Sequence, residues 1–122
     1  MAKKSYKFNE LQEAWLRDLE TTSAKQGRGY LHDSSGWCCL GRACHVAGLE
    51  GKRSQYGIYE FGEEKVLGGL PNSVQVKLKL RTRWGVPKDE GMFRGLAVLN
   101  DKGISFKKIA EILRKYPEQY FD

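Results

Sequence analysis

The chain lacks any long apolar run, because no uninterrupted stretch approaches the roughly 20 residues that a membrane-spanning helix needs. No apolar segment follows the basic N-terminal residues, where a secretory signal would carry one. Cysteine is scarce too: the count is three, and two of these are adjacent, which is atypical of a secreted disulfide scaffold. The sequence therefore predicts a soluble, intracellular protein with reduced thiols.

The sequence also lacks the motifs of common catalytic sites: no P-loop, Rossmann fingerprint, H-E-x-x-H or Ser-His-Asp order is present. Cys38, Cys39, Cys44 and His45 lie close in sequence. However, zinc sites use spaced ligand pairs, whereas adjacent cysteines on a regular element point apart. We therefore expect no enzyme, no metal and no cofactor, and we expect these thiols to be small buried hydrophobes. A nucleotide-degrading enzyme that uses His32 as acid or base is the third choice of function, after the two binding functions given at the end of this subsection.

The length of 122 residues predicts a single domain over residues 1–122. Lysine and arginine number 21 against 15 acidic residues, which gives a net charge of +6. This excess favours polyanions or small phosphorylated ligands as partners. A surface charged only for solubility would look similar, and composition leaves this alternative open.

Apolar periodicity predicts an α+β fold, a small single domain with helices packed on a short, mostly antiparallel sheet. The expected helices are one capped by Asn9, one from Cys39 that Gly48 ends, a short one over 93–99, and one from Ser105 to the residue before Pro117. We expect one hairpin with its turn at 33–36, and another that pairs 56–61 with 65–67.

The segment 74–80 alternates strictly between apolar and polar residues, which predicts an exposed edge strand. A short helix that begins after Pro71 is the alternative, because short apolar patterns fit both periods. In the strand interpretation, the basic side chains of this region keep the edge solvated, and these are Lys77, Lys79, Arg81 and Arg83.

The candidate binding loop is Gln26-Gly27-Arg28-Gly29-Tyr30, in which an arginine stands between two glycines. Glycine lets backbone N–H groups approach an anion closely, and the guanidinium supplies a planar donor fork. Tyr30 and the nearby Trp37 offer stacking faces. The alternative is that the glycines only form turns, with Arg28 solvated.

A nucleotide needs arginine or lysine clamps for its phosphates and stacking surfaces for its rings. Several further residues outside the glycine loop supply these types. Together the predicted ligand-binding residues are Gln26, Arg28, Tyr30, Trp37, Arg53, Tyr56, Arg81, Arg83 and Trp84.

Two blocks of sequence resemble a group of small phage and prophage proteins. They are Gly-Trp-Cys-Cys-Leu-Gly at residues 36–41 and Leu-Asn-Asp-Lys-Gly-Ile-Ser-Phe at 99–106, and the resemblance spans residues 8–113. Phages also carry cyclic-dinucleotide sponges of the anti-CBASS type, which sequester nucleotide signals of bacterial immunity. The chain is similar to these sponges in size, charge and lack of a catalytic constellation, and no binding residue is carried over from them.

The resemblance implies a viral protein that acts in the cytoplasm of an infected bacterial host. We expect a homo-oligomer, a dimer or tetramer, that captures a cyclic nucleotide without cleaving it, since a small chain most easily encloses such a ligand between subunits. A nucleic-acid or host-protein binding module that uses the basic segment 81–84 is the second choice.

Overall fold

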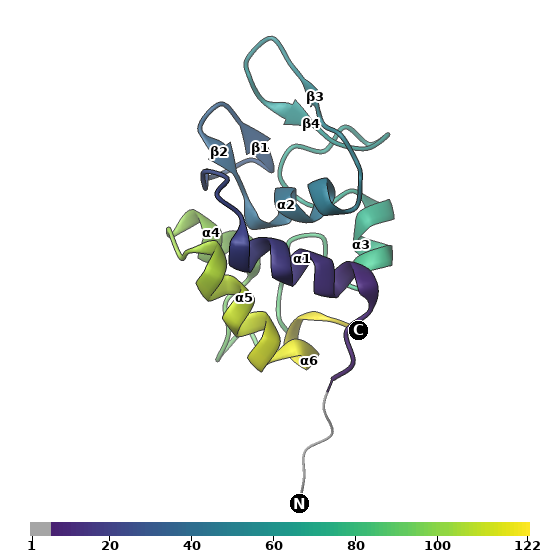
Figure 1. The fold of residues 1–122 in the computed structure, drawn as a ribbon, viewed down its shortest axis with the longest axis vertical. Coiled ribbons are helices and arrows are strands. Elements are labelled where there is room, and N and C mark those ends of the chain that lie inside the picture. Colours follow the sequence, from purple (N-terminus) through teal and green to yellow (C-terminus); the bar gives the residue numbers. More distant parts are fainter. Residues whose placement is uncertain (1–5) are drawn as a thin grey trace, which may run out of the picture.

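The structure is a computed structural model that describes residues 6–122 (Figure 1). The chain folds as a mixed α+β structure, as predicted, and side chains from every helix meet in one hydrophobic core. The elements are α1 (Glu10–Thr21), β1 (His32–Asp33), β2 (Gly36–Trp37), α2 (Cys39–Val46), β3 (Lys52–Arg53), β4 (Tyr59–Glu60), α3 (Asn72–Leu78), α4 (Leu96–Asp101), α5 (Phe106–Lys115) and α6 (Pro117–Tyr120).

Helix α1 begins with the reciprocal cap that the sequence predicts. Asn9 Oδ1 accepts a hydrogen bond from the Gln12 N–H at 2.7 Å, and Gln12 Oε1 accepts one from the Asn9 N–H at 2.8 Å. Trp15, Leu16 and Leu19 lie on the buried face of the helix. The helix that the sequence predicts after Asn9 is therefore confirmed, and this face packs it on the core.

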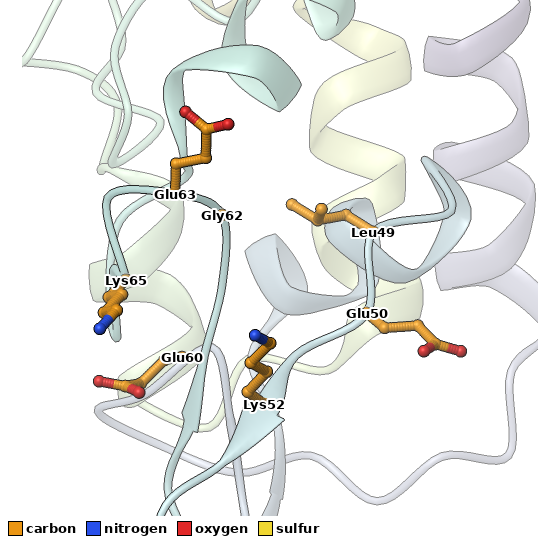
Figure 2. A pocket seen from close by; sticks show the side chains of 7 residues that line it. All are labelled: Leu49, Glu50, Lys52, Glu60, Gly62, Glu63 and Lys65. Atoms are coloured by element: carbon orange, nitrogen blue, oxygen red, sulfur yellow. The ribbon is translucent and has the colours of Figure 1, made fainter.

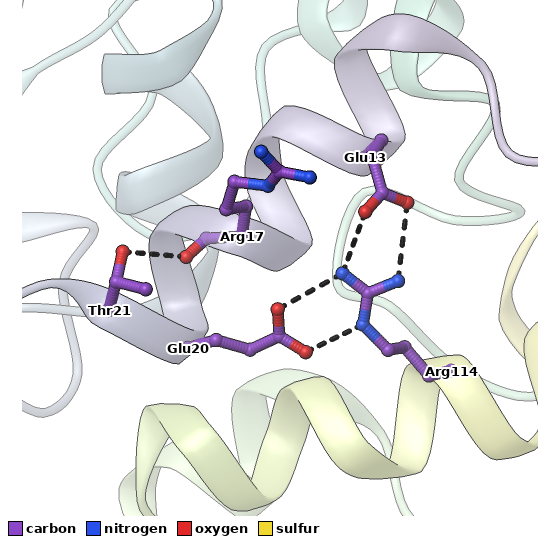
Figure 3. Close-up of polar contacts among 5 residues, drawn as sticks. All are labelled: Glu13, Arg17, Glu20, Thr21 and Arg114. Carbon is purple, nitrogen blue, oxygen red and sulfur yellow. Dashed lines mark hydrogen bonds and ion pairs between the residues drawn. The ribbon is translucent and has the colours of Figure 1, made fainter.

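Arg114 on α5 joins α5 to the exposed side of α1 through two glutamates (Figure 3). Its guanidinium donates to Glu13 at 2.8 and 3.2 Å and to Glu20 at 2.6 and 3.0 Å. Hydrogen bonding to Arg114 is the main reason why the pKa of Glu13 lies below its ordinary value. This bridge and the core beneath it hold α1 against α5.

Helix α2 packs tightly on the backbone at Leu31. A Cβ on Gly41 would overlap the Leu31 carbonyl group, so only glycine allows this approach. The Cys38 N–H donates to Leu31 O at 2.9 Å, and the Trp15 indole N–H donates to Cys39 O at 2.9 Å. The Cys-Cys-Leu-Gly block is therefore part of the core packing.

The first hairpin agrees with the prediction, and the second differs from it. β1 and β2 pair His32 with Trp37 in an antiparallel register. β4 pairs with β3 instead of with 65–67, and only an isolated bridge joins Phe61 to Val66. Two-residue strands carry too little periodicity to reveal their partners in the sequence.

The predicted edge strand over 74–80 is wrong, because this segment forms the helix α3 after Pro71. Val74 and Leu78 lie four residues apart and are both buried, whereas the side chain of Val76 is 63% exposed. Apolar residues at 74, 76 and 78 satisfy the periods of both helix and strand, and packing onto the core selects the helix.

In the view of Figure 1, α4 and α5 lie to the left of α1, and α6 lies below it. Helix α4 begins at Leu96, later than the predicted 93, and Ser105 caps α5 as predicted, since its Oγ accepts the Lys108 N–H at 3.1 Å. An antiparallel bridge then joins Phe121 to Leu80. Within residues 6–122, no helix combines the length and the apolar character that a membrane crossing would need.

Candidate functional site

Asn100 on α4 is fully buried and holds the glycine loop in place. Its Nδ2 donates to Gly27 O at 2.8 Å, and its Oδ1 accepts from Gln26 Nε2 at 2.9 Å and from the Cys39 N–H at 3.1 Å. Gln26 Nε2 also donates to Ile104 O at 2.7 Å. Gln26, a predicted ligand-binding residue, thus has its amide nitrogen occupied inside the protein.

The loop turns Arg28 and Tyr30 toward solvent. Gly29 has a φ of +83°, and its N–H donates to Asp101 Oδ1 at 3.0 Å. Arg28 Nη2 lies 3.0 Å from the position that a Cβ on Gly103 would occupy. The guanidinium therefore lies against the turn between α4 and α5, where the absence of a side chain at 103 leaves room for it.

Trp84 lies across a pair of glycines that connect it to the same loop. A Cβ on Gly68 would be 2.8 Å from Trp84 Cη2 and 3.8 Å from Gly29 O. A Cβ on Gly69 would be 2.9 Å from Arg83 Nε, and the Arg83 guanidinium carbon lies 5.9 Å from the centre of the Trp84 ring. The two glycines thus bring Trp84 and Arg83 beside the glycine loop.

We call Arg28, Tyr30, Arg83 and Trp84 the arginine–tryptophan surface. The side chains of Tyr30 and Trp84 are 37% and 45% exposed. Neither Arg28 nor Arg83 forms an ion pair within residues 6–122, although the charge of Arg83 contributes to lowering the pKa of Glu64. Exposed rings beside uncommitted guanidinium groups suit a ligand that has both a ring and a phosphate.

Trp37, another predicted ligand-binding residue, lies in a different stack of side chains. The His32 ring stacks on Trp37 with centroids 3.6 Å apart and on Tyr59 at 4.1 Å. The Arg42 guanidinium carbon lies 4.9 Å from the centre of the Trp37 ring, and Arg42 pairs with Asp18 at 2.7 Å. Burial is the main cause that lowers the pKa of His32, so its ring is neutral at pH 7.

Two hollows of about 360 Å³ each share Leu49 and Glu50 in their lining, and one of them adjoins this stack. One is lined by His32, Trp37, His45, Gly48, Leu49, Glu50, Gly51 and Tyr59. Figure 2 shows the other, to which Glu50, Glu60 and Glu63 contribute carboxylates and Lys52 and Lys65 contribute ammonium groups. Because acidic groups outnumber basic ones in the second hollow, it disfavours a phosphate.

The remaining predicted ligand-binding residues are distributed elsewhere. Arg53 lies on β3 and Tyr56 in the turn that follows, where Tyr56 is 78% exposed. Arg81 lies near the C-terminus, with its Nε 3.9 Å from Asp122 Oδ1 and its N–H bonded to Tyr120 O. Since α3 occupies Asn72–Leu78, Lys77, Lys79, Arg81 and Arg83 do not form the solvated side of one edge strand, and that interpretation is wrong.

The three cysteines are buried and free, as expected of small hydrophobes. Burial raises the pKa of the Cys44 thiol to about 12, and the pKa of Cys39 also lies well above its ordinary value, because of its hydrogen bond with Cys38 and its burial. Among residues 6–122, no cluster of three or more His, Cys, Asp or Glu side chains has the geometry of a metal site.

Sequence reasoning missed the residues that build the support of the surface. None of the predicted ligand-binding residues is Gly68, Gly69, Asn100, Asp101 or Gly103. The available signal was the block Leu-Asn-Asp-Lys-Gly, which the structure places directly under the glycine loop.

A family model for a domain of unknown function, DUF8296, matches residues 8–117. The chain belongs to the DUF8296 family. The match covers both the glycine loop and the α4–α5 turn that supports it. No curated protein and no solved structure matches the chain.

Proposed function

We propose that this DUF8296 protein binds a phosphorylated ring compound of the cyclic dinucleotide class on the arginine–tryptophan surface and sequesters it without cleaving it. In this proposal the compound is an immune signal of a bacterial host, and the protein acts for a phage in the host cytoplasm. The resemblance of its sequence blocks to phage proteins supports the proposed role in a phage. The exposed rings and arginines of the surface support the binding of a phosphorylated ring compound.

The observation that carries the proposal is the position of the Trp84 indole. It lies over Gly68 and Gly69, with Arg83 on one side and the Arg28 loop on the other. A base can stack on the exposed face of the indole, and base–aromatic stacking contributes about 1–3 kcal/mol. The two guanidinium groups can then hold phosphate oxygens by charged hydrogen bonds.

The side chains on this surface favour capture over chemistry. Arginine does not exchange a proton near neutral pH, and tryptophan has no proton acceptor that could act as a general base. The thiols of Cys39 and Cys44 lie in the core with raised pKa values, so they are protonated and inaccessible. The expected product of binding is therefore unchanged ligand.

The openness of the surface favours a second candidate, single-stranded nucleic acid. With the rings of Tyr30 and Trp84 exposed by more than a third, a strand could pass across them. Polyanion binding weakens steeply with salt through counterion release, whereas a small ligand should be less sensitive. A titration at two salt concentrations therefore separates the two candidates.

The test uses cyclic di-AMP, cyclic di-GMP, cyclic GMP-AMP and their linear products, with affinity measured by calorimetry and the ligand recovered after denaturation. We expect one cyclic compound to bind and to be recovered intact. Arg28→Ala and Arg83→Ala should each weaken binding at least about tenfold, because a charged hydrogen bond contributes about 1.5–3 kcal/mol. Arg53→Ala removes an equally exposed arginine on the β3–β4 hairpin and should bind as the wild type does.

Three results would contradict the proposal. They are no binding of any compound, recovery of a cleaved product, and equal affinities for all three arginine variants. In the last case the ligand binds elsewhere.

A further inference from the structure

Asp101, the last residue of α4, places a carboxylate beside the arginine–tryptophan surface. The residue is exposed, and its Oδ1 accepts the Gly29 N–H at 3.0 Å. Within residues 6–122, its Oδ2 accepts no hydrogen bond, and neither oxygen forms an ion pair. The surface therefore carries, next to its arginines, a hydrogen-bond acceptor that the protein itself leaves unused.

The Trp84 indole and this carboxylate both lie near Gly29. A Cβ on Gly68 would be 2.8 Å from Trp84 Cη2 and 3.8 Å from Gly29 O. The Asp101 carboxylate binds the N–H of the same Gly29. Helix α4 also connects the two, because Trp84 O accepts the Ala97 N–H in its first turn at 3.3 Å and Asp101 ends it. The six residues of this helix measure about 9 Å, a span that one nucleotide covers.

A carboxylate in this place favours a base that donates hydrogen bonds. It accepts hydrogen bonds and donates none, so it opposes a phosphate oxygen and the unprotonated ring nitrogen of adenine alike. Guanine presents two donors side by side on its Watson–Crick edge, the ring N1–H and the exocyclic amino group, whereas adenine presents one donor beside an acceptor. A base stacked on the indole with this edge toward Asp101 is therefore recognised as guanine, while Arg28 and Arg83 remain available for the phosphates.

Resting on the proposed function, we propose that Asp101 selects the base and that the preferred ligand carries guanine. The two guanine donors bind the unused lone pairs of the carboxylate, and the hydrogen bond from the Gly29 N–H is kept. Adenine would bring its ring N1 against the carboxylate, with no donor between the two acceptors. A site built on such a pair of hydrogen bonds discriminates strongly, because the wrong base leaves its polar groups unpaired.

The experiment compares the calorimetric affinities of the full chain for cyclic di-GMP and cyclic di-AMP. We expect cyclic di-GMP to bind at least about tenfold more tightly, because one hydrogen bond to a charged group already supplies this factor. Asp101→Asn keeps an acceptor for the Gly29 N–H and replaces the unused oxygen with an amide donor. It should bind cyclic di-GMP at least about tenfold more weakly than the wild type does, and it should lose the preference for guanine.

Asp89→Asn is the matched control. Asp89 is also exposed, and its Oδ1 accepts the Gly91 N–H at 3.1 Å in the same way. It lies in a loop beside α6, where its own N–H donates to Gln119 Oε1 at 2.8 Å. The affinities of this variant for both ligands should equal those of the wild type.

The outcomes separate this inference from the proposed function. Equal affinities of the wild type for the two ligands, or tighter binding of cyclic di-AMP, overturn the choice of guanine and leave the proposed function in place. A preference for cyclic di-GMP that Asp101→Asn retains overturns the role of Asp101. No binding of any cyclic dinucleotide overturns both this inference and the proposed function.

Discussion

Replacing Asn100 with alanine should destabilise the fold severely. The side chain is fully buried and bonds to the Gly27 carbonyl and the Cys39 amide, which the variant leaves buried without partners. Each such orphaned group costs about 1–3 kcal/mol, so we expect the free energy of unfolding to fall by about 2–6 kcal/mol. Urea unfolding followed by tryptophan fluorescence measures this loss, and Asn72→Ala, at an exposed asparagine on α3, is the control, with a change within about 0.5 kcal/mol.

The variant Asn100→Asp tests the same contacts through pH. It keeps the shape and the Oδ1 acceptor, but when ionised it has no donor for the Gly27 carbonyl. Burial raises the pKa of such a carboxyl in the folded state, so the variant is most stable at low pH and loses stability as pH rises through the folded pKa. If Asn100→Ala loses less than about 1 kcal/mol, or if Asn100→Asp shows no such pH dependence relative to the wild type, Asn100 does not hold the loop as described.

Two further predictions concern packing and charge away from the binding surface. Gly41→Ala places a methyl group against a backbone carbonyl and should lower the free energy of unfolding by at least about 1–3 kcal/mol, whereas Gly91→Ala, in an open loop, should be nearly neutral in the same denaturation assay. Because the pKa of Glu13 is lowered, its pairing with Arg114 stabilises the fold above the ordinary carboxyl pKa, and this stabilisation is lost as pH falls. The difference in the free energy of unfolding between wild type and Arg114→Met should therefore shrink from pH 7 to pH 3. A constant difference would refute this.

The long helices could be predicted from the sequence, because each has both a cap and an extended periodic face. In α1, Asn9 and Gln12 form the cap and Trp15, Leu16 and Leu19 the face, and these signals agree with one another. In the segment 72–78, no cap and extended periodic face support one another in this way. Its apolar residues fit helix and strand equally, and only the core beneath Val74 and Leu78 decides between them.

The strand pairing of the second hairpin could not be predicted from the local sequence either, for a different reason. Tyr59 pairs with Arg53 across a turn, although Phe61 and Val66 also form a bridge further on. Both pairings are present, and the turn signals of this region do not reveal that Tyr59 and Glu60 also pair with an earlier segment, which depends on tertiary contacts such as the bridge between Asp33 and Ile58.

The residue types of the candidate site could be predicted, but their grouping could not. Arg83 and Trp84 come close to the glycine loop because Gly68 and Gly69 carry no side chain where the indole and the guanidinium approach the backbone. Arg53 and Tyr56 on the β3–β4 hairpin and Arg81 near the C-terminus are of the same residue types as the surface residues, and composition holds no information on which loops meet.

The most direct test of the central claim, that a ring stacks on Trp84, is tryptophan fluorescence during titration with the cyclic dinucleotide that binds. The chain has three tryptophans; Trp15 is fully buried and Trp37 is half-buried against His32, so Trp84 is the one exposed to a ligand ring. We predict that the ligand quenches the wild type and Trp37→Phe, and that Trp84→Phe binds, with an aromatic ring retained, but shows no quenching. Equal quenching in Trp84→Phe and the wild type would contradict the account.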